Sequence, residues 1–267
     1  MTAFARSLAS EFVKLFSTRM WWLLLVILTG YVGIGAAGIA FALTVAPEQS
    51  GMLVGPGGLA PIVYSMATAS GFVFPVILGA MSITSEVRHR TLTTAFLATP
   101  SRSAVLIAKA IVALAIGALY GVVATASTTG LGALVLGGSG EPTGLDDERT
   151  WAMLARMVLA MAVWGLVGVG VGVVVPSQVG SIVGILAFTQ FVEPIVRTAA
   201  AFVEPLGQVA RFLPGAAGDA LVGASFYTAI GGAAESLEWW QGGLVLAGYA
   251  VVLLAIGALT TWRRDVT

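Results

Sequence analysis

Side chains that could carry catalytic chemistry are scarce in this chain of 267 residues. It has no cysteine and a single histidine, His89, whereas a zinc site needs several nitrogen or sulfur ligands. The only lysines are Lys14 and Lys109, and neither follows the glycine that a phosphate-binding P-loop requires. No Gly-x-Ser-x-Gly motif occurs, and the aspartates all fall outside the long apolar stretches. We therefore predict that the chain is not an enzyme and has no catalytic residue, metal site or cofactor site of its own.

The most informative group of charged side chains lies between residues 84 and 103. Glu86 precedes Arg90 by one helical turn, which is the favourable order for an ion pair within a helix. Leu92 and Phe96 add an apolar patch, and Pro100 would end such a helix. A short helix with these two faces could dock into a cytosolic protein. Alternatively, the segment is a solvated loop whose arginines only set the membrane topology, and the residues alone leave both interpretations open.

A second charged pair, Glu193 and Arg197, lies one helical turn apart near the end of an apolar stretch. Ionisable residues at membrane depth are costly, and they are by default candidates for function. The alternative is that both side chains already lie among the headgroups and neutralise each other.

Glycines recur at spacings that favour close helix packing. The segment from Gly33 to Gly38 matches a dinucleotide-binding spacing, but it lies within an apolar stretch with no strand before it, so we expect helix packing there. Three further pairs follow the small-xxx-small pattern, and they could pack within one subunit or between two: Gly117 and Gly121, Gly168 and Gly172, and Gly180 and Gly184.

The elements that must position these residues are membrane spans. Apolar residues make up 58% of the chain and charged ones 10%, against about 25% charged residues in soluble domains. The zero net charge leaves no basic patch for nucleic acid. We predict an all-α integral membrane protein, with residues 1–267 forming a single transmembrane domain.

Six uncharged runs predict six transmembrane helices, since a span needs about 20 apolar residues. The fifth reaches Glu193 and Pro194 after only a short uncharged run, so we predict a short or broken helix there. Residues 1–19 form an amphipathic helix at the membrane interface, with its basic stripe toward headgroups or a partner, and residues 193–238 form an outer segment. The expected spans are Trp21–Val45, Ile62–Ser82, Ala104–Leu136, Trp151–Val175, a fifth that begins at Val179, and Trp239–Trp262.

The charges between the spans predict the orientation. If the amino terminus is cytoplasmic, nine of the 13 basic residues lie on the inner side, as the positive-inside rule requires. We therefore expect both termini in the cytoplasm and a multi-pass protein of the plasma (inner) membrane. The inner basic residues are Arg6, Lys14, Arg19, Arg88, Arg90, Arg102, Lys109, Arg263 and Arg264.

The stretch Ile83–Lys109 resembles the hallmark of ABC-2 type transporter permeases. In that family a span ends in an I-T-x-E step, followed by basic residues, a threonine-rich turn, P-x-R and a lysine that opens the next span. The segment Ser10–Arg19 resembles the family's entry helix, and Phe212–Gly215 resembles its L-P element before the last span. The matching residues of the connector are Ile83, Thr84, Glu86, Arg88, Thr91, Pro100, Arg102 and Lys109.

The resemblance implies the transmembrane subunit of an exporter that moves a hydrophobic drug, peptide or lipid-like substrate out of the cytoplasm. ATP and Mg would be bound by a separate cytosolic ATPase subunit in two copies, and a second copy of this or a related permease would complete the complex within membrane lipid. Residues 84–103 would be the coupling loop, and short re-entrant helices would form the outer segment. A non-transporting membrane sensor or immunity component, or less readily an intramembrane enzyme, is the alternative.

The site residues that follow from this resemblance fall into three groups. The coupling residues are Thr84, Glu86, Arg88, His89, Arg90, Thr91, Leu92, Phe96 and Arg102; those of the interface helix are Arg6, Glu11, Lys14 and Arg19; the candidate outer gate comprises Glu193, Arg197 and Pro214.

Overall fold

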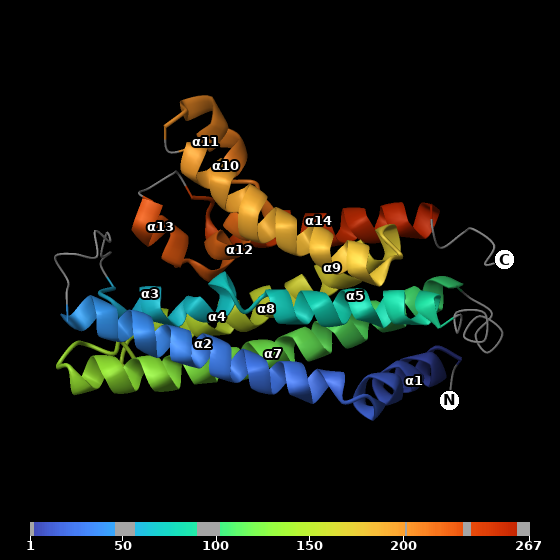
Figure 1. Cartoon of the computed structure of the whole chain (residues 1–267), viewed down its shortest axis with the longest axis horizontal. Helices are drawn as coiled ribbons and strands as arrows, with labels where there is room; N and C mark the ends of the chain where they lie inside the picture. Colours follow the sequence, from blue (N-terminus) through green and yellow to red (C-terminus); the bar gives the residue numbers. More distant parts are fainter. Residues whose placement is uncertain (1–2, 46–56, 90–101, 201, 232–235, 261–267) are drawn as a thin grey trace.

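The computed structural model describes residues 3–45, 57–89, 102–200, 202–231 and 236–260, and the regular elements in these ranges are all helices. Figure 1 shows them arranged as an elongated bundle. They are α1 (Ala3–Ser17), α2 (Met20–Val45), α3 (Ala60–Tyr64), α4 (Met66–Ala69), α5 (Val73–Arg88), α7 (Arg102–Gly138), α8 (Glu148–Val174), α9 (Gln178–Ala187), the π-helix η2 (Phe188–Val192), α10 (Glu193–Ala200), α11 (Glu204–Ala210), α12 (Pro214–Val222), α13 (Phe226–Gly231) and α14 (Trp239–Leu259).

Six helical stretches in these ranges are long and apolar enough to cross a membrane, which agrees with the six predicted spans. They explain the low charge content, because their outward faces contact lipid rather than water. The stretches are Met20–Val45, Ala60–Arg88, Arg102–Gly138, Glu148–Val174, Gln178–Ala200 and Trp239–Leu259.

Glycines allow the three central helices α5, α7 and α8 to approach closely. A Cβ added at Gly79 of α5 would lie 2.2 Å from the carbonyl oxygen of Gly165 in α8, and one at Gly168 would lie 2.2 Å from that of Val76. A Cβ at Gly117 of α7 would lie 2.7 Å from the Met161 oxygen. The predicted pairs in α7 and α8 therefore pack within one chain, since small residues let helix backbones meet.

The third pair differs, because Gly184 has open space around its Cβ position and a Cβ on Gly180 would meet only Val175 and Ser177, just before α9. Among the described residues, this face of α9 is therefore not packed against another helix.

The second span is broken rather than continuous. It consists of α3, α4 and α5, with interruptions at Ser65 and at residues 70–72. The hydroxyl of Ser65 donates to the carbonyl of Ile62 within the buried interior. The last helix of this span continues to Arg88, six residues beyond the expected end at Ser82, so the predicted coupling segment begins inside α5.

The fifth span is interrupted, as expected, but it is not short. Helical structure continues from Gln178 through the π-helix to Ala200, a length of 23 residues, or roughly 35 Å at 1.5 Å per residue. Pro194 lacks an N–H donor, and the wide π-helical turn directly before α10 accommodates its place in the helix. Glu193 thus lies within a span instead of ending it.

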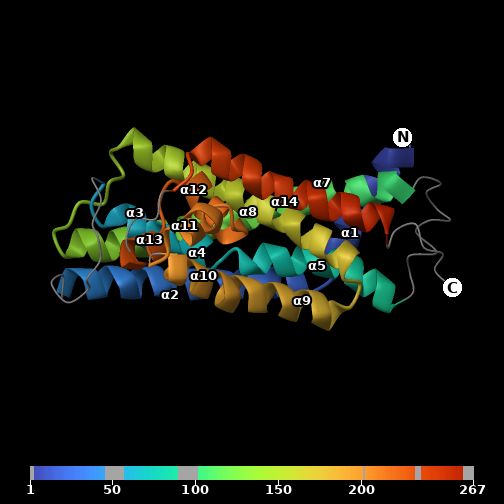
Figure 2. The same ribbon diagram turned by 90° about the horizontal axis from the view of Figure 1, so that it is seen from above.

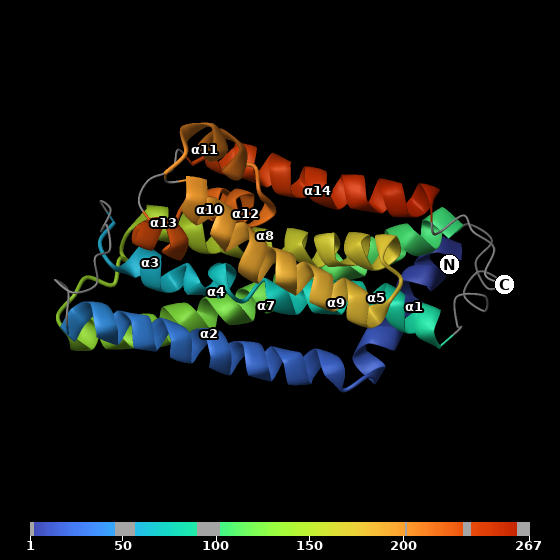
Figure 3. The same ribbon diagram turned by 45° about the horizontal axis from the view of Figure 1, so that its top comes forward.

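The two ends of the bundle carry different elements. Helix α1 and the last turns of α14 lie at the same end, which is also where α5 ends and α7 begins (Figures 1 and 2). The short helices α10 to α13 gather toward the opposite end, where α12 packs against α14 and α8 (Figure 3). The glycine after α12, Gly223, has a φ of 82°, a left-handed conformation that ends the helix.

Candidate functional site

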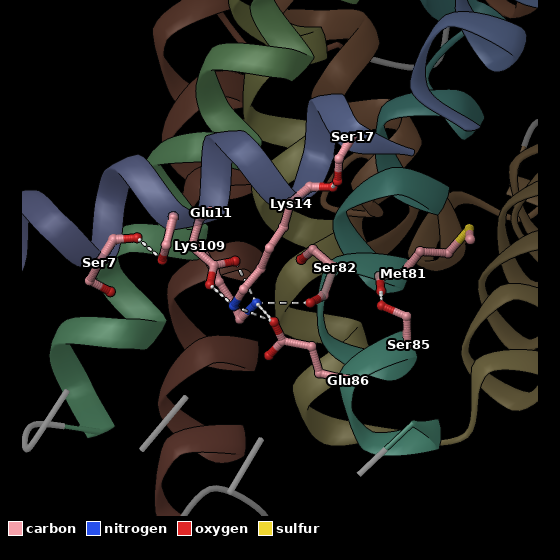
Figure 4. Close-up of polar contacts among 10 residues, drawn as sticks. Ser7, Glu11, Lys14, Ser17, Met81, Ser82, Ser85, Glu86 and Lys109 are labelled. Atoms are coloured by element: carbon pink, nitrogen blue, oxygen red, sulfur yellow. Dashed lines mark hydrogen bonds and ion pairs between the residues drawn. The ribbon is translucent and has the colours of Figure 1, made fainter. Parts of the chain in front are cut away.

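Four charged side chains from three helices converge where α1 crosses the bundle (Figure 4). This ion cluster consists of Glu11 and Lys14 from α1, Glu86 from the last turn of α5, and Lys109 from the third turn of α7. The Lys109 Nζ atom lies 2.6 Å from Glu11 Oε2 and 2.9 Å from Glu86 Oε1. The Lys14 Nζ atom lies 2.6 Å from Glu11 Oε1 and 2.8 Å from Glu86 Oε1.

The cluster is largely shielded from solvent. The exposed fractions of the Lys109, Glu11 and Glu86 side chains are 1%, 6% and 10%, whereas Lys14 is 46% exposed. The Lys109 ammonium also donates to the carbonyl of Ser82 at 3.0 Å, so its three N–H donors each have an acceptor. Two positive and two negative charges balance, which offsets the large desolvation cost of burying any one of them.

The half-exposed member, Lys14, stays charged. Burial alone would lower its pKa, but hydrogen bonds to Glu11 and Glu86 and the charges of those carboxylates outweigh burial and raise the pKa of Lys14. At neutral pH the cluster therefore holds this ammonium in place. The expectation that the basic stripe of the entry helix turns toward headgroups or a partner is wrong for Lys14, because Glu86 attracts it toward the bundle.

The remaining members of the predicted interface group behave differently. Arg6 and Arg19 are exposed, while Glu11 is buried on the face of α1 that meets α7. The apolar residues Val13 and Phe16 are exposed, at 68% and 46%. The helix therefore buries a polar contact against the bundle and leaves apolar side chains outward, as a helix at a membrane interface can.

The predicted coupling residues that the structure describes lie close to the cluster. Thr84 is fully buried and donates to the Ala80 carbonyl, Glu86 is a cluster member, and the exposed His89 follows the last residue of α5. The Arg88 guanidinium donates to the Gln178 side chain at 3.3 Å, which links α5 to the start of α9. Arg102 opens α7. Outside the described residues lie Arg90, Thr91, Leu92 and Phe96, and with them the predicted pair of Glu86 and Arg90.

Sequence reasoning did not find that Lys109 and Glu11 are partners of Glu86. Lys109 lies 98 residues from Glu11 along the chain, and no local pattern connects them. A signal was nevertheless present, because a lysine within the long apolar stretch of α7 must be paired if it is buried.

A second polar site lies toward the other end of the bundle. The buried Glu193 carboxylate accepts hydrogen bonds from the backbone N–H groups of Gly215 at 3.0 Å and Ala216 at 2.8 Å, in the first turn of α12 after Pro214. These N–H groups have no partner within their own helix, so the carboxylate caps α12. The three residues of the candidate outer gate, Glu193, Arg197 and Pro214, therefore meet at one place.

Arg197 does not form an ion pair with Glu193 in the headgroup zone, as one interpretation of the sequence supposed. Its guanidinium contacts Asp219 of α12 at 2.8 Å and lies 5.1 Å from the centre of the Tyr227 ring. The hydroxyl of Ser225 donates to the same Asp219 oxygen at 2.6 Å. Sequence analysis missed Asp219, because the partner that pairs with it lies in another helix.

Burial raises the pKa of Asp219, and this effect outweighs the opposing influence of Arg197 and Ser225.

No group of three or more histidine, aspartate or glutamate side chains in the described part of the chain could hold a metal ion. Both polar sites join helices that lie far apart in the sequence.

Comparison with known proteins places this architecture in a family. A search of curated proteins finds no match to the chain. The family model described as ABC-2 family transporter protein matches residues 7–195, which include every member of the ion cluster and Glu193. The match covers well over half of the sequence, with the first four spans complete and most of the fifth. The chain therefore belongs to the ABC-2 family of transporter proteins.

Proposed function

We propose that the chain is the permease subunit of an ABC exporter, which moves a hydrophobic drug, peptide or lipid-like substrate out of the cytoplasm. ATP and Mg bind to a separate ATPase subunit, and two permease chains assemble with two copies of that ATPase. Family membership and six spans support the permease role. The ion cluster is the single observation that carries the coupling mechanism, because it joins the end of the second span to the entry helix and to the third span.

In the proposed orientation, the bundle spans the plasma membrane, and the end that holds α1 faces the cytoplasm. The distribution of basic residues supports this side. Because the chain has no cysteine, single cysteines report sidedness directly. In intact cells, an impermeant maleimide should label Ser139→Cys but not Ser17→Cys. Labelling of both variants from outside would show that the two ends are not on opposite sides of the membrane.

Coupling begins in residues 84–103, which the ATPase pair displaces when it closes on ATP. The displacement reaches α5 directly, and the buried contacts of Glu86 transmit it to α1 and α7. The contact between Arg88 and Gln178 extends it to α9 at the start of the fifth span. Such a change alters transport only if the ATPase contacts differ between the inward- and outward-open states.

The outer gate consists of Glu193, Arg197 and Pro214. A cavity of only about 20 Å³ lies between α4, η2, α10 and α12, which supports a gate that is closed in this state. It lies beside the break in the second span and the π-helix of the fifth, two interruptions where a span can bend. Opening requires α12 to separate from Glu193 and Arg197.

The test is transport by the complex with its ATPase. The chain is purified with the P-loop ATPase that accompanies it, reconstituted in proteoliposomes and assayed for ATP-driven accumulation of a fluorescent hydrophobic drug and for stimulated ATP hydrolysis. Glu86→Ala and Arg88→Ala should lower stimulated hydrolysis while membrane insertion is unchanged, and removal of residues 1–18 should weaken ATPase association.

Glu141→Ala, at an exposed position at the opposite end, is the matched control. Because Glu86 is buried and its loss also destabilises the fold, the exposed Arg88 provides the decisive variant. If stimulated ATP hydrolysis is as high with Arg88→Ala as with Glu141→Ala, the assignment of the coupling segment is wrong. ATP hydrolysis without movement of any offered substrate would favour a sensor or immunity component.

A further inference from the structure

A cavity of about 720 Å³ lies next to the ion cluster, between α1, the start of α2, α5 and α7. This volume is within the range of about 300–1,000 Å³ typical of small-molecule sites. The cavity begins at the cluster and follows α5 as far as Leu78 and α7 as far as Ile116. These residues lie seven or eight positions from Glu86 and Lys109, or roughly 10–12 Å along each helix.

The two ends of this cavity differ in polarity. Apolar side chains line its deep part, which extends along two membrane spans: Leu78, Val112, Ala113 and Ile116. Hydroxyl and charged groups line the end near α1, together with Leu15 and Met20. A molecule that fills the cavity therefore needs one apolar chain and one polar head.

The polar end offers several hydrogen-bond acceptors beside the ammonium groups of the cluster. Four of the hydroxyl groups that line it already donate their hydrogens to carbonyls of their own helices, so these four oxygens can only accept. These bonds are Ser10 to Ser7 at 2.7 Å, Thr18 to Leu15 at 2.9 Å, Ser82 to Gly79 at 2.7 Å and Ser85 to Met81 at 2.5 Å. In addition, Glu86 Oε2 is buried and has no donor among the described residues.

Charge at this end is balanced, since Glu11 and Glu86 match Lys14 and Lys109. An anionic head would meet carboxylates and hydroxyl lone pairs with no net positive charge to compensate. A head with N–H or O–H donors would supply the hydrogen bond that Glu86 Oε2 lacks. Because Oε2 is covered, binding must turn the carboxylate toward the cavity.

We propose that this cavity binds one single-chain amphiphile with a donor-bearing, non-anionic head, either an ammonium or a hydroxyl group. The chain lies between α5 and α7, and the head lies at the ion cluster. The inference rests on the proposed function only in assigning the cytoplasmic leaflet as the source of the ligand. Binding needs no ATPase, so a failure of binding and a failure of transport are separate results.

The experiment measures binding of tritiated dodecylammonium to the full chain in phosphatidylcholine nanodiscs, with empty nanodiscs as the blank. Unlabelled dodecylammonium, dodecyl glycerol ether and dodecyl phosphate compete for the site, and all three share one chain length. We expect saturable binding of one equivalent per chain, competition by dodecyl glycerol ether as well as by unlabelled dodecylammonium, and at least tenfold weaker competition by dodecyl phosphate. Whichever of dodecylammonium and dodecyl glycerol ether competes more strongly identifies the preferred head group.

Val112→Phe fills the cavity from α7 and should weaken binding at least tenfold. Leu119→Phe is the matched control, because it adds the same ring to the same helix at a position that faces outward and does not line the cavity. Ser85→Leu repeats the test from α5 should Val112→Phe fail to fold. Glu86→Gln should weaken binding of dodecylammonium more than binding of dodecyl glycerol ether.

The proposal is wrong if binding is no greater than to empty nanodiscs, if dodecyl phosphate competes best, or if both filling variants bind as well as Leu119→Phe. If the cavity-filling substitutions change the oligomeric state but not probe binding, a second copy of the chain covers this surface. That result also contradicts the proposal.

Discussion

Replacing Lys109 by methionine tests whether the ion cluster stabilises the junction of α1, α5 and α7. The substitution keeps most of the side-chain length but leaves the Glu11 and Glu86 carboxylates with only Lys14 as a cationic partner. Removing one partner from a buried ion pair costs about 3–5 kcal/mol. At about 2–4 °C per kcal/mol for a large domain, the apparent Tm should fall by about 6–20 °C.

The matched double variant separates charge from packing. Glu11→Gln combined with Lys109→Met restores neutrality, so it should recover a substantial part of the lost stability, and the two substitutions should be non-additive. Arg19→Met, at an exposed position of the same region, is the control and should change stability by less than about 0.5 kcal/mol.

The assay is thermal unfolding in nanodiscs at one scan rate, since unfolding of membrane proteins is often irreversible and then depends on the rate. If Lys109→Met unfolds at the same temperature as Arg19→Met, the ion cluster does not stabilise this junction. If the double variant is no more stable than Lys109→Met, a buried uncompensated charge is not the cause of the lost stability.

Three other predictions concern packing, capping and pH. Gly79→Ala should lower the free energy of unfolding by about 1–3 kcal/mol, because the added methyl group overpacks against α8. Gly184→Ala, in open space, should leave it nearly unchanged, and thermal unfolding of the two variants measures the difference. Glu193→Ala removes the cap of α12 and should cost about 0.5–2 kcal/mol and raise hydrogen exchange at Gly215, with unchanged exchange in α7 as the control. Burial raises the pKa of Asp219, so the folded chain binds a proton at this carboxyl group more tightly than the unfolded chain does. The contribution of Asp219 to stability should therefore fall as the pH rises above about 4. Asp219→Asn should flatten the profile of Tm against pH in that range, and an unchanged profile would contradict the assigned cause.

Much of the helical organisation could be predicted because membrane insertion depends on local properties. A run of apolar residues long enough to cross the bilayer must form a helix, since lipid offers no partner for a free backbone group. This is why the six predicted spans agree with six helical stretches in the structure. The connector motif also predicted the family, which the match over residues 7–195 confirms.

Helix interruptions were less predictable. The break at residues 70–72 lies within an uncharged stretch with no proline at those positions, so hydropathy gave no sign of it. Pro194 did mark the fifth span, but the helix continues through a π-helical turn instead of ending there. Whether a backbone can deviate from the α-helix depends on the neighbouring helices that pack around it.

By itself, then, the sequence determined that the chain enters the membrane, how many spans it can form and which segments carry its charge, because hydropathy and charge are properties of consecutive residues. Only the tertiary structure decided that Glu86 meets Lys14 and Lys109, and that Glu193 caps α12. A buried charge requires a partner whatever its distance along the chain, and the partner is chosen by how the helices pack.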